Sequence, residues 1–174
     1  ELISSSIKYL KSLGKEVHFD AEHFFDGFSA NKKYAISIVK EAMASGADWV
    51  VLCDTNGGCM PDQVRETIES LGEEGIDVKK LGIHAHNDTE NAVANSLAAV
   101  QAGVRQIQGT LNGLGERCGN ANLISLLPTL LLKPQFSEKF VTGVTSDSLK
   151  ELTRVSRIMD DVLNRVPNRF APYV

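Results

Sequence analysis

Short apolar runs alternate along the chain with longer segments in which apolar residues recur every three or four positions. The first pattern is typical of strands buried on both faces, and the second predicts amphipathic helices. Loops rich in Gly, Asp and Asn separate the two kinds of segment, and 20–27 is expected to be such a loop. The predicted strands are 15–19, 48–53, the run that begins at Gly82, and 105–110. The predicted helices are 3–13, 33–45, 61–74, 88–102, 123–132 and 146–164.

This order of elements predicts an α/β fold. The strand and helix unit recurs with a period of roughly 25 to 33 residues, close to one eighth of a (β/α)8 barrel of about 250 residues. Four such units make half of a TIM barrel. A doubly wound open sheet is the other arrangement that this alternation permits. In both folds the chemistry gathers at the carboxyl ends of the strands.

Composition and charge exclude several classes of partner. The chain has 174 residues, 43% of them hydrophobic, and a formal net charge of -4. It contains no basic tract of the kind that binds nucleic acid and no apolar run long enough to cross a membrane. The N-terminus lacks the basic start of a signal peptide, and the odd number of cysteines fits reduced thiols, so the sequence predicts a cytoplasmic protein.

Two histidines form the strongest candidate for chemistry. His84 and His86 are separated by one residue on a predicted strand, and the period of two in a strand turns both toward the same side. Neutral imidazole is a good ligand for divalent metals such as Zn and Mn. The alternative is that one histidine belongs to the core and the other is exposed. Further polar residues that follow the predicted strands could converge with this pair on one pocket: Glu22, Thr55, Glu116 and Asn120.

Each of these residues also has a plainer interpretation. Asn120 could be a metal ligand through its amide oxygen, or it could cap the helix that follows it. Thr55 could bind a substrate carboxylate or be an ordinary turn residue, and Glu22 could be an acid, a base, an orienting group or a solvated carboxylate. Asp54 is expected to brace its own loop. The glycine-rich loop 112–120 could present N–H groups to an anion, but it lacks the residues of a nucleotide-binding loop.

Two motifs resemble a known enzyme group. His84-Ala85-His86-Asn87-Asp88, followed by Gly113-Leu114-Gly115-Glu116-Arg117-Cys118-Gly119-Asn120, is similar to the metal-dependent Claisen-type synthases and lyases built on a TIM barrel. This group includes 2-isopropylmalate, homocitrate and citramalate synthases and HMG-CoA lyase. The segments 20–27 and 52–58 most resemble the citramalate synthase branch.

The resemblance implies an acyltransferase that condenses acetyl-CoA with a 2-oxo acid. Since the citramalate synthase branch is the most similar one, the implied oxo acid is pyruvate and the product is citramalate, on the way to isoleucine. A divalent metal (Mn, Zn or Mg) would polarise the keto group of the oxo acid. The implied metal ligands are His84, His86 and Asn120. Thr55 is similar to the residue that binds the substrate carboxylate, and Glu22 is similar to the catalytic glutamate. Glu116 joins Glu22 as a catalytic candidate, in a role that organises the loop beside the site.

The resemblance also sets the expected domains and the rival functions. Residues 1–145 would be the second half of the catalytic barrel, and 146–174 would begin a helical linker subdomain. An arginine and a metal-binding aspartate of the family's first strand, and a histidine from the second subunit of a homodimer, have no counterpart here, so this piece alone is expected to be nearly inactive. The alternatives are an isopropylmalate or homocitrate synthase, an HMG-CoA-type lyase, and a non-catalytic half-barrel module.

Overall fold

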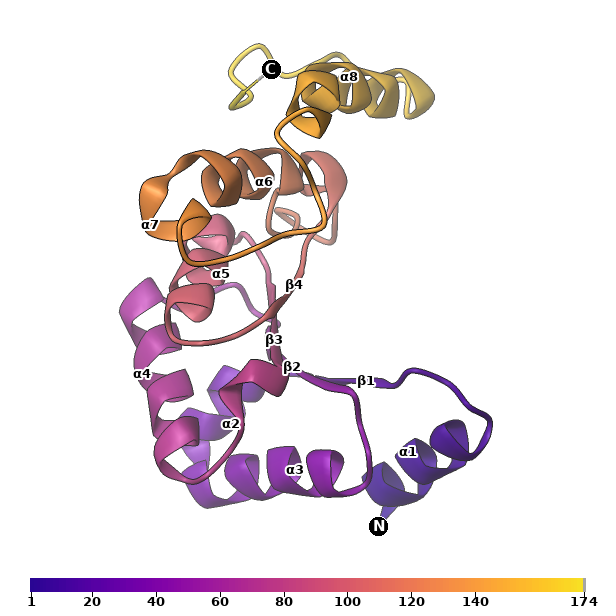
Figure 1. The fold of residues 1–174 in the computed structure, drawn as a ribbon, viewed down its shortest axis with the longest axis vertical. Coiled ribbons are helices and arrows are strands. Elements are labelled where there is room, and N and C mark those ends of the chain that lie inside the picture. Colours follow the sequence, from indigo (N-terminus) through magenta and orange to yellow (C-terminus); the bar gives the residue numbers. More distant parts are fainter. Residues whose placement is uncertain (174) are drawn as a thin grey trace. The chain divides into compact units, whose positions relative to one another are not determined.

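The structure is a computed structural model and describes residues 1–173 (Figure 1). The chain divides into two compact units, Glu1–Gln108 and the residues from Gly109 onward. The first unit holds α1 (Leu2–Ser12), β1 (His18–Ala21), α2 (Phe24–Ala30), α3 (Lys32–Ala44), β2 (Trp49–Asp54), α4 (Pro61–Glu73), η1 (Val78–Lys80), β3 (Leu81–Ala85), α5 (Ala92–Gln101) and β4 (Gln106–Gln108). The second holds η2 (Leu111–Gly113), α6 (Leu123–Leu132), α7 (Pro134–Ser137), η3 (Ser148–Glu151) and α8 (Leu152–Val162).

The first unit is built on a four-stranded parallel sheet whose strand order, β1-β2-β3-β4, follows the sequence. Each connection therefore advances in the same direction along the sheet. A doubly wound sheet requires the strand order to reverse at one point, whereas a barrel does not. The α/β half-barrel prediction is confirmed, and the doubly wound alternative is wrong.

Side chains of the first and last strands show that this sheet is curved. Gln106 Nε2 lies 2.8 Å from His18 Nδ1, and Gln108 donates to Asp20 across 3.1 Å. In a flat sheet, β1 and β4 would be about 14 Å apart, because neighbouring strands are spaced by about 4.8 Å. The hydrogen bonds between their side chains require a concave face, as in a barrel wall.

The convex face is the apolar side of the sheet. Leu81, Ile83 and Ala85 of β3 point to this side and are fully buried, whereas His84 points to the concave side and is half-buried. Helices α2, α3 and α5 contact the strands, and α4 packs against α5. Burial of these side chains supplies most of the stability of the unit.

Three predicted elements of this unit differ from the structure by more than two residues at one end. The first strand begins at His18 and not at Lys15, because the Val17 N–H donates to the Asp48 carboxylate at 2.7 Å and not to a neighbouring strand. Helix α2 lies within the predicted loop 20–27 and beyond it, since burial of two phenylalanines outweighs the poor helix propensity of Gly27. Helix α5 begins at Ala92, later than predicted, and Asn87 accepts a hydrogen bond from the Ala92 N–H at 3.2 Å.

The second unit corrects two further predictions. Asn122, and not Asn120, caps α6, because its Oδ1 accepts the Ile124 N–H at 2.9 Å. The predicted helix 146–164 is instead a 3-10 turn, η3, followed by α8. Among residues 1–173, no helix combines the length and the hydrophobicity that a membrane span needs.

Candidate active site at the carboxyl edge of the sheet

The two histidines converge at the end of β3. His84 Nε2 and His86 Nε2 lie 3.3 Å apart, and their ring centroids are separated by 5.1 Å. His86 directly follows the strand, where its N–H donates to the Asp54 carbonyl at 3.3 Å, and it is only 7% exposed. Neither imidazole is fully exposed, so the structure does not match the plainer interpretation of one core and one solvated histidine.

The spacing of these nitrogen atoms suits a shared metal ion. Two ligand nitrogens, each about 2.1 Å from one ion and 90 to 110° apart, are separated by about 3.0 to 3.4 Å. The observed 3.3 Å lies within this range. Imidazole pairs bind Zn, Mn, Fe and similar divalent ions. The donor set in the first unit therefore fits a divalent metal.

Thr55 and Glu22 form a second pair at the same edge. The Thr55 hydroxyl accepts the His23 N–H at 2.7 Å and donates to Glu22 Oε2 at 2.7 Å. His23 stands in a left-handed conformation, with φ at 53°, at the start of helix α2. Glu22 is exposed, and its carboxylate accepts the hydroxyl proton of Thr55. Since this hydroxyl has one proton, it cannot donate to Glu22 and to a second acceptor at the same time.

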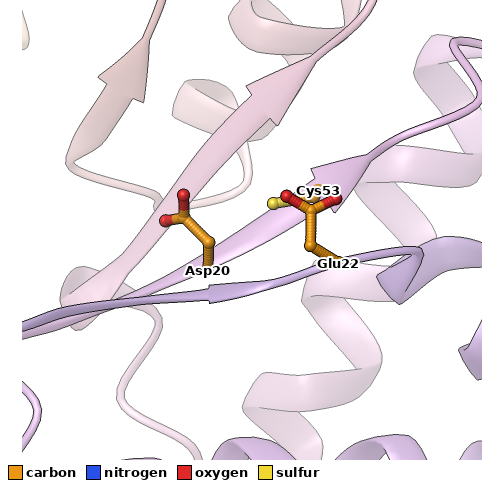
Figure 2. Close-up of side chains that lie close together, drawn as sticks. All are labelled: Asp20, Glu22 and Cys53. Carbon is orange, nitrogen blue, oxygen red and sulfur yellow. The ribbon is translucent and has the colours of Figure 1, made fainter.

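Glu22 also belongs to a cluster of three potential metal-ligand atoms (Figure 2). One side-chain oxygen of Asp20, one of Glu22 and the Cys53 sulfur all lie within 4.8 Å of one another. Burial raises the pKa of the Cys53 thiol, and the Glu22 and Asp20 carboxylates raise it further, so the thiol stays protonated at neutral pH. Asp20 is not among the site residues predicted from sequence, although its spacing of two from Glu22 is a signal that both side chains turn the same way at the end of β1.

Gln108 connects the carboxylates to the histidines. Its Oε1 lies 2.8 Å from His84 Nδ1, and its Nε2 donates to Asp20 at 3.1 Å. The pairing of His84 with Gln108 in the register of β3 and β4 explains why the two side chains meet. Gln108 is also absent from the site residues predicted from sequence. The signal that could have found it is the Gln-x-Gln spacing of β4, which repeats the His-x-His spacing of β3.

Asp54 lies below this edge and belongs to the scaffold. Its Oδ2 accepts the Cys59 N–H at 3.2 Å and the Asn95 amide at 3.4 Å, and Asn95 also donates to the Cys59 carbonyl at 2.9 Å. The bonds join the loop after β2 to helix α5. Asp54 thus braces its own loop, as predicted, and this loop carries Thr55.

The remaining candidates belong to the glycine-rich loop of the second unit. The Glu116 side chain is 82% exposed, and its carboxylate lies 3.9 Å from the Arg117 guanidinium. Asn120 is buried, its N–H donates to the Gly113 carbonyl at 3.0 Å, and its Oδ1 lies where a side chain on Gly115 would have to stand. Gly115 therefore accommodates Asn120, and the loop is shaped around that amide.

Comparison with known proteins identifies the family. The profile of the HMGL-like family matches residues 1–158. The chain belongs to the HMGL-like family.

Curated relatives include two (R)-citramalate synthases and one more distant synthase. The chain is 48% identical over 173 residues to the protein of Aquifex aeolicus, covering 99% of this chain and 32% of the relative. It is 49% identical over 174 residues to that of Geobacter sulfurreducens, covering 100% and 32%. The 2-isopropylmalate synthase of Methylacidiphilum infernorum is 36% identical over 155 residues, covering 88% and 29%. The chain thus spans about a third of the length of these relatives.

Solved structures support the fold. The carboxyl transferase domain of Rhizobium etli pyruvate carboxylase, solved with pyruvate, superposes with a TM-score of 0.70 at 20% identity, over 93% of this chain and 26% of that one. The HMG-CoA lyase from Brucella melitensis superposes with a TM-score of 0.66 at 18% identity, over 91% and 57%. At such identities the likeness concerns the fold alone.

Proposed function

We propose that these residues form part of an acyltransferase that condenses acetyl-CoA with pyruvate to give citramalate and free CoA. The observation that carries the proposal is the pair of imidazoles whose Nε2 atoms lie 3.3 Å apart, in a chain 48% identical to an (R)-citramalate synthase. Isopropylmalate synthase is the second candidate, because one such relative is 36% identical. The higher identity favours pyruvate as the acceptor, and a place on the route to isoleucine.

In this proposal His84 and His86 hold a divalent cation, with Mn, Zn and Mg as the candidates, and the Asn120 amide oxygen is a further ligand. When bound, such a cation acts as a Lewis acid that polarises the keto group of the oxo acid. Imidazoles of fixed orientation lose little freedom on binding, which favours tight retention of the ion. The active form is proposed to be a homodimer.

Glu22 is the proposed base. Its Oε2 takes a proton from the methyl carbon of the acetyl thioester, and the electron pair of that C–H bond forms a new bond to the keto carbon of pyruvate. The keto oxygen takes a proton from solvent to become the hydroxyl of the product, and Glu22 returns its proton to solvent. Water then cleaves the C–S bond of the thioester: its oxygen joins the acyl carbon as a carboxylate, one proton goes to the CoA sulfur to give the free thiol, and the other goes to solvent. Glu116 is proposed to organise the loop beside this step.

Thr55 couples substrate binding to this base. In the structure its hydroxyl proton is donated to Glu22. When the same hydroxyl donates to the carboxylate of the oxo acid, Glu22 Oε2 loses that donor and is free to accept a different proton. Binding of pyruvate therefore prepares Glu22, while the His23 N–H keeps the Thr55 oxygen in place.

The test is the release of CoA thiol by the full-length protein with acetyl-CoA, a divalent metal and a panel of 2-oxo acids. We expect release with pyruvate, and a loss of both bound metal and activity in His84→Ala and His86→Ala. His18→Ala is the matched control, because His18 lies on the same face but bonds to Gln106. A preference for 2-oxoisovalerate would move the assignment to isopropylmalate synthase. A folded, metal-loaded protein that releases no thiol with any acceptor would refute the synthase proposal and favour a lyase or a non-catalytic role.

A further inference from the structure

We propose that Asp20 and Gln108 are positioning residues that fix the proton of His84 on Nδ1 and so leave the lone pair on Nε2. The inference rests on the proposed function in one respect, the assignment of His84 as a metal ligand. It concerns a contact that reaches from β1 to β4 across the concave face of the sheet.

Asp20 sets the direction of the two hydrogen bonds that join it to Gln108 and Gln108 to His84. An ionised carboxylate can only accept, so the group of Gln108 that lies 3.1 Å from Asp20 Oδ1 must be its NH₂. The amide oxygen of Gln108 then faces His84 Nδ1 at 2.8 Å, and an oxygen cannot donate there. Nδ1 must therefore carry the proton. In a neutral imidazole this leaves Nε2 as the acceptor atom, and Nε2 is the atom that faces His86.

A second glutamine on the same strand has the opposite polarity. His18 Nε2 lies 3.1 Å from the Glu16 carboxylate, so Nε2 must be the protonated nitrogen of His18. Its Nδ1 then accepts from the Gln106 amide nitrogen at 2.8 Å. Gln106 Oε1 is buried without a hydrogen-bond partner among the described residues. The two glutamines of β4 thus hold two histidines in different tautomers, and in each case a carboxylate sets the direction.

The tautomer decides whether His84 can bind a cation. With the proton on Nε2, an N–H group would point at the place where an ion has to bind. Partners that orient a ligating histidine through its other nitrogen typically contribute a factor of about 10 to 100 in metal affinity. Loss of the amide oxygen of Gln108 should therefore weaken binding by about that factor without removing a ligand.

The experiment measures the affinity of the metal-free full-length protein for Zn²⁺, by competition with a chromophoric chelator. Gln108→Leu should bind about 10 to 100 times more weakly than the wild type. Gln106→Leu is the matched control, because it removes the neighbouring amide from the same face of the same strand, and it should stay within about twofold. Circular dichroism of each metal-free variant shows that it is folded.

Restoring the polarity gives a sharper test. Asp20→Asn removes the carboxylate that can only accept. Because the new amide can either donate to Gln108 or accept from it, the direction of the hydrogen bonds is no longer fixed, and Zn²⁺ binding should weaken. The double variant Asp20→Asn, Gln108→Glu rebuilds the direction, since the new amide can donate to the new carboxylate, which accepts from His84 Nδ1. It should bind Zn²⁺ more tightly than Asp20→Asn alone and more tightly than Gln108→Leu. A double variant no better than Gln108→Leu would overturn the proposal.

A spectroscopic signature separates positioning from loss of structure. In the Co²⁺-loaded protein, the Nδ1–H of a ligating histidine gives a strongly shifted proton signal that disappears in D₂O. We expect one such signal to disappear in His84→Ala, and the same signal to exchange faster with solvent in Gln108→Leu and to stay unchanged in Gln106→Leu. An unchanged exchange rate in Gln108→Leu would contradict the bond to Gln108.

The outcomes also separate this inference from the proposed function. If His84→Ala bound Zn²⁺ as tightly as the wild type, the metal assignment in the proposed function would fail, and this inference with it. If His84→Ala lost binding while Gln108→Leu stayed within about twofold of the wild type, the ligand assignment would stand and only the role of Gln108 and Asp20 would be wrong.

Discussion

Replacing Asn95 by alanine should loosen the loop that carries Thr55, although Asn95 lies on helix α5 and is fully buried. Its amide nitrogen donates to the Cys59 carbonyl at 2.9 Å and to Asp54 at 3.4 Å. The Asp54 carboxylate still accepts the Cys59 N–H in the variant. The substitution thus removes two donors from buried acceptors and leaves the rest of the loop intact.

The size of the effect follows from these contacts. A buried acceptor that loses its donor costs about 1 to 3 kcal/mol. This cost applies in full to the Cys59 carbonyl and only in part to Asp54, because its carboxylate keeps the Cys59 N–H. Asn95 Oδ1 is itself buried without a partner among the described residues, so its removal returns part of that cost. We expect a net loss of about 2 kcal/mol in the free energy that keeps the loop closed.

The assay is hydrogen exchange by mass spectrometry on a peptide that spans 54–60. A loss of about 2 kcal/mol in local opening free energy speeds exchange of the Cys59 amide by a factor of about 30. Ser96→Ala is the matched control, because Ser96 is equally buried on α5 but donates only within the helix, to the Ala92 carbonyl at 2.8 Å. Equal exchange in Asn95→Ala and the wild type would refute the bracing role of Asn95.

Two further predictions concern titration and thiol chemistry. Lys11 and the Val17 N–H hold the pKa of Asp48 below its ordinary value of 3.8, so Asp48 stabilises the fold above about pH 4 and this contribution is lost as the pH falls through the lowered pKa. In urea unfolding at neutral pH, Asp48→Asn should therefore have a lower free energy of unfolding than the wild type. In acid, below the lowered pKa, the two proteins should differ less in this free energy. An equal difference at both pH values would contradict this origin. Cys118 is exposed and the other two cysteines are buried, so a thiol reagent should modify one group rapidly, and Cys118→Ser should abolish that phase; a rapid phase that persists in this variant would show that a buried thiol is accessible.

The order and type of the long elements could be predicted from the sequence because their signal is local. Helices α3 and α4 lie within one residue of their predicted bounds, since an apolar stripe and a clear stop define each of them. Helix α2 was missed because what stabilises it is burial of Phe24 and Phe25 against residues distant in sequence. The Asp and Gly residues of this segment predict a loop.

The site was predicted unevenly for the same reason. The alternation of a strand placed His84 beside His86, and this requires only the local backbone. Gln108 and Asp20 could not be paired from sequence, because their contact depends on how strongly the sheet curves. The roles of Glu116 and Asn120 stay predictions, as do the domain bounds 1–145 and 146–174.

The two faces of the sheet carry different kinds of side chain. The interior of a closed barrel is usually filled by branched apolar side chains, yet β1 and β4 place His18, Asp20, Gln106 and Gln108 on the concave face. Each of these side chains bonds to at least one other polar group on this face. Apolar replacements at these positions would remove the hydrogen bonds that orient His18 and His84. The concave face therefore carries the polar side chains that orient the histidines, while the buried apolar side chains of β3 lie on the convex face.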